Sequence, residues 1–191
     1  MIQILLGLAL WSAAHGLKIH ASARRAALVA KHGEGPLKGG VAVLILASVA
    51  LMVWGYQSAG WTNVWFPPAW TVHLNNLLMV VALGIYSAGA FRGHVRHWIR
   101  HPQLIGVKTW AIAHLIVNGD LASIVLFGGL LAWAVVAVIG LNRRDGKGEK
   151  PGPGTLTGNL LHGGVTLVLL VGVGYVHYWL GVWPFPGTPP V

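Results

Sequence analysis

Six long apolar stretches restrict the fold of this chain more than any other feature of its sequence. Each approaches the roughly 20 mostly apolar residues that a helix needs to cross the hydrocarbon core of a bilayer. They lie at about Ile2–Leu17, Gly39–Tyr56, Val72–Phe91, Leu104–Val117, Leu121–Leu141 and Asn159–Leu180. The first and fourth are short, and we expect the first to gain length by continuing past Lys18 toward Arg25. The sequence therefore predicts an all-α fold: a polytopic membrane bundle of about six transmembrane helices, forming a single integral membrane domain over residues 1–191.

The composition excludes the main alternatives to a membrane protein. Hydrophobic residues make up 55% of the chain and charged residues 9%, whereas a soluble domain is roughly 25% charged. A soluble fold of this length could not bury so much apolar surface, and a disordered chain would be far more polar. There is no cysteine, which excludes disulfides, iron–sulfur clusters, cysteine-ligated zinc and thiol nucleophiles.

The positive charges predict the orientation of the helices. All 13 Lys and Arg residues fall on the first, third and fifth connections between the apolar stretches. They are Lys18, Arg24, Arg25, Lys31, Lys38, Arg92, Arg96, Arg100, Lys108, Arg143, Arg144, Lys147 and Lys150. By the positive-inside rule this face is cytoplasmic and both termini are non-cytoplasmic. The net charge of +9 then reflects topology and contact with anionic lipid, and no nucleic-acid-binding module is present.

Acidic residues are too few for carboxylate chemistry inside the membrane. The chain has four, and only Asp120 lies on the outer side, so paired-carboxylate catalysis in the bilayer is excluded. We interpret Asn118-Gly119-Asp120 as a tight helical hairpin, with Gly119 as the C-cap of one helix and Asp120 as the N-cap of the next.

Of the ten histidines, His15 and His114 are the strongest candidates for a functional site, because we place them deepest in the bilayer. His114 lies about 18 Å along its helix from Pro102, and His15 about 20 Å along its helix from Ile2. Because these two spans run in opposite directions, the two imidazoles are predicted at similar depths, which suits bis-histidine ligation of a haem iron. The alternative is that each histidine only forms a hydrogen bond to a neighbouring helix.

Other polar residues carry weaker predictions. His162, which has two glycines beside it, and His20 are reserve ligands. His94, His97 and His101 share one helical face, which suits either a metal cluster or, as we favour, a basic interfacial helix. We place His73 and His177 toward the outer face, and expect the amides of Asn75 and Asn76 to cross-link helices.

Several motifs resemble the NnrU membrane-protein family. The most specific is the run HPQLIGVKTWAIAHL at residues 101–115, followed by NGDLAS at 118–123 and FGG at 127–129. The segments 11–15 (WSAAH) and 73–79 (HLNNLLM) are also similar. The resemblance defines an NnrU-like core over about 1–145 and leaves 146–191 as a C-terminal hairpin and span.

The resemblance implies a multi-pass protein of the bacterial inner (cytoplasmic) membrane that holds haem b, with His15 and His114 at the family's ligand positions. The family includes bacterial proteins associated with denitrification and nitric oxide metabolism, and the ζ-carotene isomerases. A thiolate has been proposed as an alternative ligand in the plant isomerases, and its absence here counts against isomerisation.

Three functions remain open from the sequence. The first is a bis-histidine haem b protein linked to nitric oxide. The second is an enzyme, a haem-dependent cis–trans isomerase of a polyene dissolved in the bilayer. The third is a non-haem scaffold or transporter, which would be colourless when purified.

Overall fold

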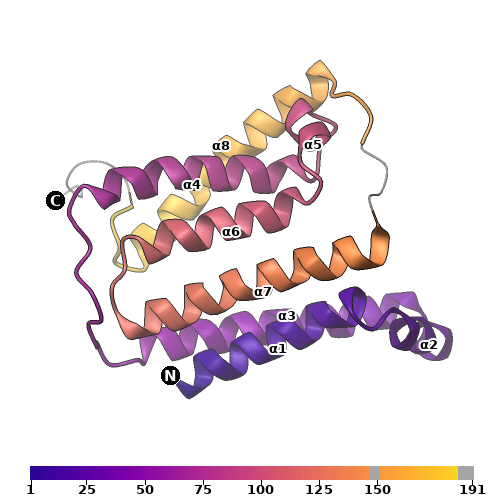
Figure 1. Cartoon of the computed structure of the whole chain (residues 1–191), viewed down its shortest axis with the longest axis horizontal. Helices are drawn as coiled ribbons and strands as arrows, with labels where there is room; N and C mark the ends of the chain where they lie inside the picture. Colours follow the sequence, from indigo (N-terminus) through magenta and orange to yellow (C-terminus); the bar gives the residue numbers. More distant parts are fainter. Residues whose placement is uncertain (147–150, 185–191) are drawn as a thin grey trace. The chain divides into compact units, whose positions relative to one another are not determined.

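The computed structural model describes residues 1–146 and 151–184, and this part of the chain folds into eight α-helices with no strand (Figure 1). The helices are α1 (Ile2–Ile19), α2 (Ser22–His32), α3 (Glu34–Gln57), α4 (Thr71–Ala88), α5 (His94–Trp98), α6 (Pro102–Leu115), α7 (Leu121–Asp145) and α8 (Leu156–Trp179). The predicted all-α fold is confirmed. Lys147 and Lys150, two members of the predicted charge pattern, lie outside the described residues.

Five of these helices are long and apolar enough to cross a membrane, namely α1, α3, α4, α7 and α8. The remaining predicted span, Leu104–Val117, corresponds to α6, which has 14 residues. A helix of that length rises about 21 Å, less than the roughly 30 Å of a hydrocarbon core. The bundle therefore consists of five full-length candidate spans and one shorter apolar helix.

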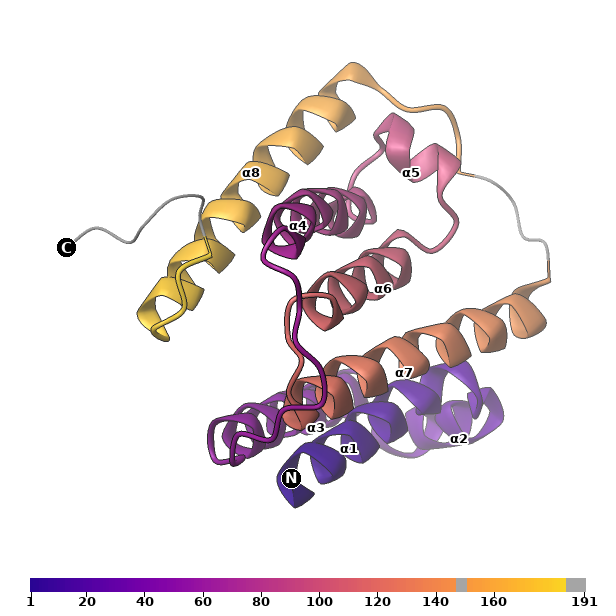
Figure 2. The same cartoon turned by 60° about the vertical axis from the view of Figure 1, so that its left-hand side comes forward.

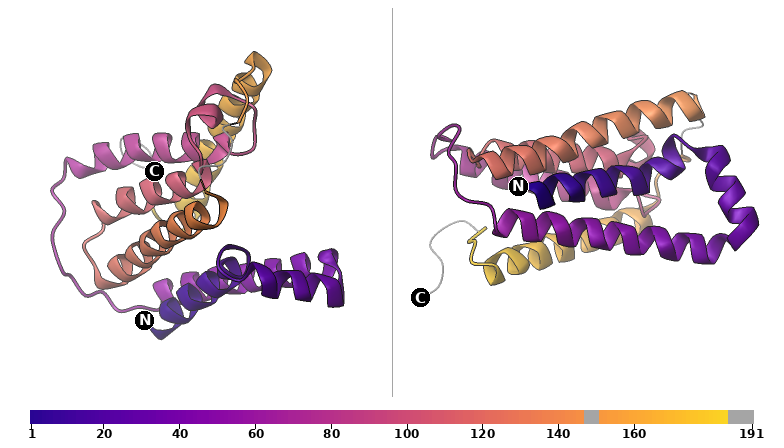
Figure 3. Two further views of the ribbon diagram at one scale, coloured as in Figure 1. Left: turned by 45° about the vertical axis from the view of Figure 1, so that its right-hand side comes forward. Right: turned by 90° about the horizontal axis from the view of Figure 1, so that it is seen from below.

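The expected extension of the first helix toward Arg25 is wrong. Helix α1 ends at Ile19, and the backbone turns at His20 and Ala21 before α2 begins. Helix α2 links the end of α1 to the start of α3 (Figure 3), and Arg25 in its first turn pairs with Glu34, the first residue of α3. Its arginines, lysine and histidine are typical of a basic helix lying at a membrane interface.

The chain divides into two compact units, of which the first comprises Met1–Phe66 and Asn118–Lys147. In it α1 packs against both α3 and α7 (Figure 3). Glycines allow the helix backbones to approach closely: a Cβ on Gly7 would lie 2.8 Å from the Ser48 carbonyl oxygen, and one on Gly55 would lie 2.6 Å from the Ile4 nitrogen. Such close packing at small residues is the usual way in which helices associate inside a membrane.

The connection before α7 belongs to this first unit and differs from the predicted hairpin. The C-cap of α6 is Ile116, not Gly119. Instead, the Gly119 carbonyl accepts hydrogen bonds from the amides of Val64 and Trp65, at 2.8 and 3.1 Å. The other half of the prediction is confirmed, because Asp120 caps α7 by accepting a hydrogen bond from the Ser123 amide at 2.9 Å.

The second unit comprises Pro67–Val117 and Gly148–Val191, and in it α4 lies between α6 and α8 (Figure 2). A Cβ on Gly106 of α6 would lie 2.8 Å from the Ala82 carbonyl oxygen of α4. On the other side of α4, the hydroxyl groups of Ser87 and of Thr166 on α8 are 2.8 Å apart. Helices α4 and α6 run antiparallel, as do α4 and α8, so the C-terminal ends of α6 and α8 lie at the end of the unit where α4 begins.

Candidate functional site

His15 lies on α1 in an aromatic environment within the first unit. Its ring is half-buried, with its centroid 4.3 Å from that of Trp11 on the same helix and 4.9 Å from that of Trp133 on α7. Its Nδ1 lies 3.0 Å from the Trp11 carbonyl oxygen. The ring is therefore held by a backbone hydrogen bond and by two indole rings.

His114 lies on α6 in the second unit and is held in the same way. Its Nδ1 lies 2.9 Å from the Trp110 carbonyl oxygen, and the two rings are 4.9 Å apart. Because α6 ends at Leu115, His114 is in the last turn of its helix rather than well inside a span.

His177 on α8 faces His114, which the sequence analysis did not foresee. The two ring centroids are 6.3 Å apart with an interplanar angle of 42°. The Nδ1 of His177 lies 2.8 Å from the Val173 carbonyl oxygen, again four residues earlier in the helix. The sequence did contain one signal for the pair, since both histidines end helices that run toward the same end of the unit.

The shared geometry of these three histidines determines their tautomer. A carbonyl oxygen can only accept a hydrogen bond, so each Nδ1 must carry the proton that it donates. The Nε2 atom then keeps its lone pair, which is the form in which histidine ligates a metal. Metal-binding histidines generally donate their other nitrogen to a carbonyl or carboxylate in this way, so the donor set fits an iron held by imidazoles, as in haem.

The structure brings together His114 and His177 but describes His15 in the other unit. The predicted pairing of His15 with His114 therefore stays a prediction. In the part of the chain that the structure describes, no three His, Asp or Glu side chains gather as a metal site would require.

The reserve ligands have other contacts. The Nε2 of His162 donates a hydrogen bond to the Gly84 carbonyl oxygen of α4 at 2.7 Å, so this histidine cross-links two helices. His20 is exposed at the C-terminal end of α1, with its ring against Gly140 of α7.

The histidines near the basic third connection bind protein groups. His94 accepts a hydrogen bond from the Asn159 side-chain amide at 2.7 Å, and the Nδ1 of His97 donates to the Pro151 carbonyl oxygen at 2.6 Å. They attach the short helix α5 to the segment that begins α8. These contacts give the alternative of a metal cluster no support. Pro102 occupies the first turn of α6, after His101 as N-cap.

The amides of Asn75 and Asn76 do not form the predicted helix cross-links. The Nδ2 of Asn75 lies 3.4 Å from the Oδ1 of its neighbour Asn76, and its own Oδ1 is buried without a hydrogen-bond partner in the described residues. The antiparallel register places Asn75 near the level of His114, because Gly106 lies opposite Ala82 farther along the same two helices.

A family model described as NnrU protein matches residues 3–184. The chain belongs to the NnrU family. The match continues past residue 145, where the predicted NnrU-like core ends, and so includes His162 and His177 of α8. Comparison with curated proteins and with solved structures found no match.

Proposed function

We propose that this NnrU chain is a haem b-binding protein of the bacterial inner membrane, linked to denitrification and nitric oxide metabolism. His114 ligates the iron, and His15 is the second ligand that the family resemblance implies. The observation that carries the proposal is the shared anchoring of both rings, in which Nδ1 donates to a backbone carbonyl and leaves Nε2 as the ligating atom.

The residues around the histidines supply orientation and an apolar environment. Trp11 and Trp133 restrict rotation of the His15 ring, and Trp110 does the same for His114. Small buried neighbours, Ala14 beside His15 and Ala113 beside His114, let the helix that carries each histidine pack closely against the rest of its unit. When bound, haem would supply one-electron chemistry and an iron able to bind a diatomic ligand.

An absorption spectrum of the detergent-purified protein tests the proposal. We expect a Soret band in the parent protein and its loss in both His15→Ala and His114→Ala, because each would remove one of the two proposed ligands. His73→Ala is the matched control, since His73 is an exposed histidine near the start of α4. A Soret band that persists in both ligand variants, or a colourless parent protein, contradicts the assignment; the latter favours a non-haem scaffold or transporter.

His177 provides a second arm of the same experiment. If His177→Ala loses the band while His15→Ala keeps it, the ligand pair is the one that the second unit already brings together. Addition of nitric oxide to the reduced protein then tests the link to nitrogen oxides: a shifted spectrum supports gas binding, and an unchanged spectrum contradicts it.

One observation favours the isomerase as a second candidate. An apolar groove of about 170 Å³ lies between α4 and α6, and Trp110, which contacts His114, is one of its lining residues. This volume is below the roughly 300–1,000 Å³ of most small-molecule pockets. It would nevertheless suffice for a polyene of which only one segment enters the groove. Co-expression with ζ-carotene tests this function, and a failure to convert it under reducing conditions contradicts it.

A further inference from the structure

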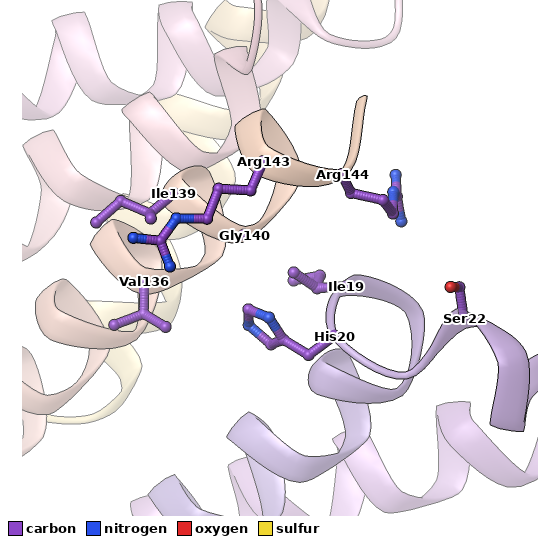
Figure 4. Close-up of a pocket in the computed structure, with 8 residues that line it drawn as sticks. All are labelled: Ile19, His20, Ser22, Val136, Ile139, Gly140, Arg143 and Arg144. Carbon is purple, nitrogen blue, oxygen red and sulfur yellow. The ribbon is translucent and has the colours of Figure 1, made fainter. Parts of the chain in front are cut away.

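A second pocket lies in the first unit, at the ends of helices α1 and α7 and the start of α2. Its volume is about 390 Å³ (Figure 4). It is separate from the aromatic surroundings of His15, and the proposed haem chemistry does not use it.

The polar wall of the pocket is cationic. The Arg143 guanidinium group and the His20 ring extend into the same opening from α7 and from the end of α1 (Figure 4). Within residues 1–146 and 151–184, neither side chain has a hydrogen bond or an ion pair. Arg144 also lines the pocket, but its guanidinium group is bound to Asp145 and to the Lys18 carbonyl oxygen. The donors that remain for a ligand are therefore those of Arg143 and His20.

Gly140 positions the His20 ring. A Cβ at Gly140 would collide with Cε1 of this ring and lie 2.7 Å from Cγ2 of Ile19. The missing side chain thus lets the imidazole lie directly against α7, one turn before Arg143.

The part of the pocket wall nearer the middle of α7 is apolar. Val136 and Ile139 of α7 line it, and they are 55% and 45% exposed although they lie on a helix long enough to span a membrane. The pocket is consequently amphipathic, with cationic groups at the helix ends and exposed aliphatic side chains toward the middle of α7.

We propose that this pocket binds an anionic phospholipid, with the phosphate group held by Arg143 and His20 and the upper acyl chain lying along Val136 and Ile139. The planar guanidinium group offers parallel N–H donors that match phosphate oxygens, and the Ser22 hydroxyl lies at the rim as a further donor. Basic pockets between membrane helices at the cytoplasmic side are typical lipid-headgroup sites. Inorganic phosphate shares the headgroup's chemistry, but it would leave the apolar wall uncovered.

Native mass spectrometry of the full chain tests the proposal by counting lipids retained after exchange into micelles that contain phosphatidylglycerol or phosphatidylcholine. We expect one phosphatidylglycerol to be retained selectively. Its affinity should fall about tenfold in Arg143→Gln, as for the loss of roughly one charge-assisted contact. Ile139→Trp should lower lipid retention without changing the charge, because the indole would occupy the space proposed for the acyl chain. Arg24→Gln is the matched control, since Arg24 is an exposed arginine of α2 that does not line the pocket.

Three results would overturn the proposal. Equal losses in Arg143→Gln and Arg24→Gln would indicate general attraction to a basic surface. Equal retention of the two lipids would remove the requirement for an anionic headgroup. Displacement of the bound lipid by excess inorganic phosphate would identify a site for the free anion. Circular dichroism of each variant confirms that the helices remain folded.

Discussion

Asp120 is an acidic side chain buried at the start of α7. Its environment both stabilises and destabilises the folded protein. It is 3% exposed, and one of its oxygens caps the helix through the Ser123 amide. The other oxygen, Oδ2, is buried without a hydrogen-bond partner in the described residues. The cap stabilises the helix, whereas the unpartnered oxygen costs desolvation energy.

Substitutions at Asp120 should separate these two contributions. Asp120→Ala removes the cap, and we expect a loss of about 1 kcal/mol of stability, the usual cost of removing an N-cap side chain. Asp120→Asn keeps an oxygen that accepts from the Ser123 amide and removes the charge, so its stability should equal or exceed that of the parent. Thermal unfolding in detergent, followed by circular dichroism, measures both. A lower midpoint for Asp120→Asn than for the parent would show that the charge itself has an unrecognised partner.

At the scale of helices, the sequence predicted which segments are apolar but not every helix end. The break between α1 and α2 was missed because His20 and Ala21 are neither glycine nor proline, and no local breaker marks the turn there. Gly119 was misassigned because its carbonyl pairs with Val64 and Trp65, which are distant in sequence.

The candidate site shows the same division. The four-residue spacing of His114 from Trp110 is a local property, and so the histidine could be recognised from its motif. Its position in the last turn of a helix was not predicted, because the end of α6 at Leu115 carries no local signal. That His177 faces it depends on how α8 is rotated about its own axis when it packs against α4. Such a rotation is set by contacts like Ser87 with Thr166, which one sequence alone does not reveal.

The packing of α1 against α3 leads to a prediction at this scale. At Gly7 an added Cβ would lie 2.5 Å from Cγ of Met52 and 2.8 Å from the Ser48 carbonyl oxygen, so even a methyl group forces the backbones apart. We expect Gly7→Ala to cost about 1–3 kcal/mol, the usual range for overpacking. Thermal unfolding measures this loss, and Gly128→Ala is the matched control because nothing lies within 4 Å of its Cβ position. Equal midpoints for the two variants would contradict close packing of α1 on α3.

At the scale of the whole molecule, the distribution of charge predicts a single orientation in the membrane. The described part of the chain supports the pattern on which this rests, since α2 and the segment from Arg92 to Arg100 around α5 carry basic residues while the connection from Ser58 to Trp70 has none. The positive-inside rule then places α2 in the cytoplasm and the connection after α3 outside.

Single cysteines test this orientation directly, because the natural chain contains none. Ser58 follows α3 and Ala23 lies on α2, and both are small, exposed residues, so each tolerates a cysteine. In intact cells, a membrane-impermeant maleimide should label Ser58→Cys and leave Ala23→Cys unlabelled until the membrane is disrupted. Labelling of Ala23→Cys but not of Ser58→Cys in intact cells would show that the orientation is the reverse of the predicted one. The proposed lipid pocket, which lies at the start of α2, would then be in the outer leaflet. Labelling of both positions in intact cells would contradict a fixed orientation, because the bias of Lys and Arg to one face would then fail to determine how the helices insert.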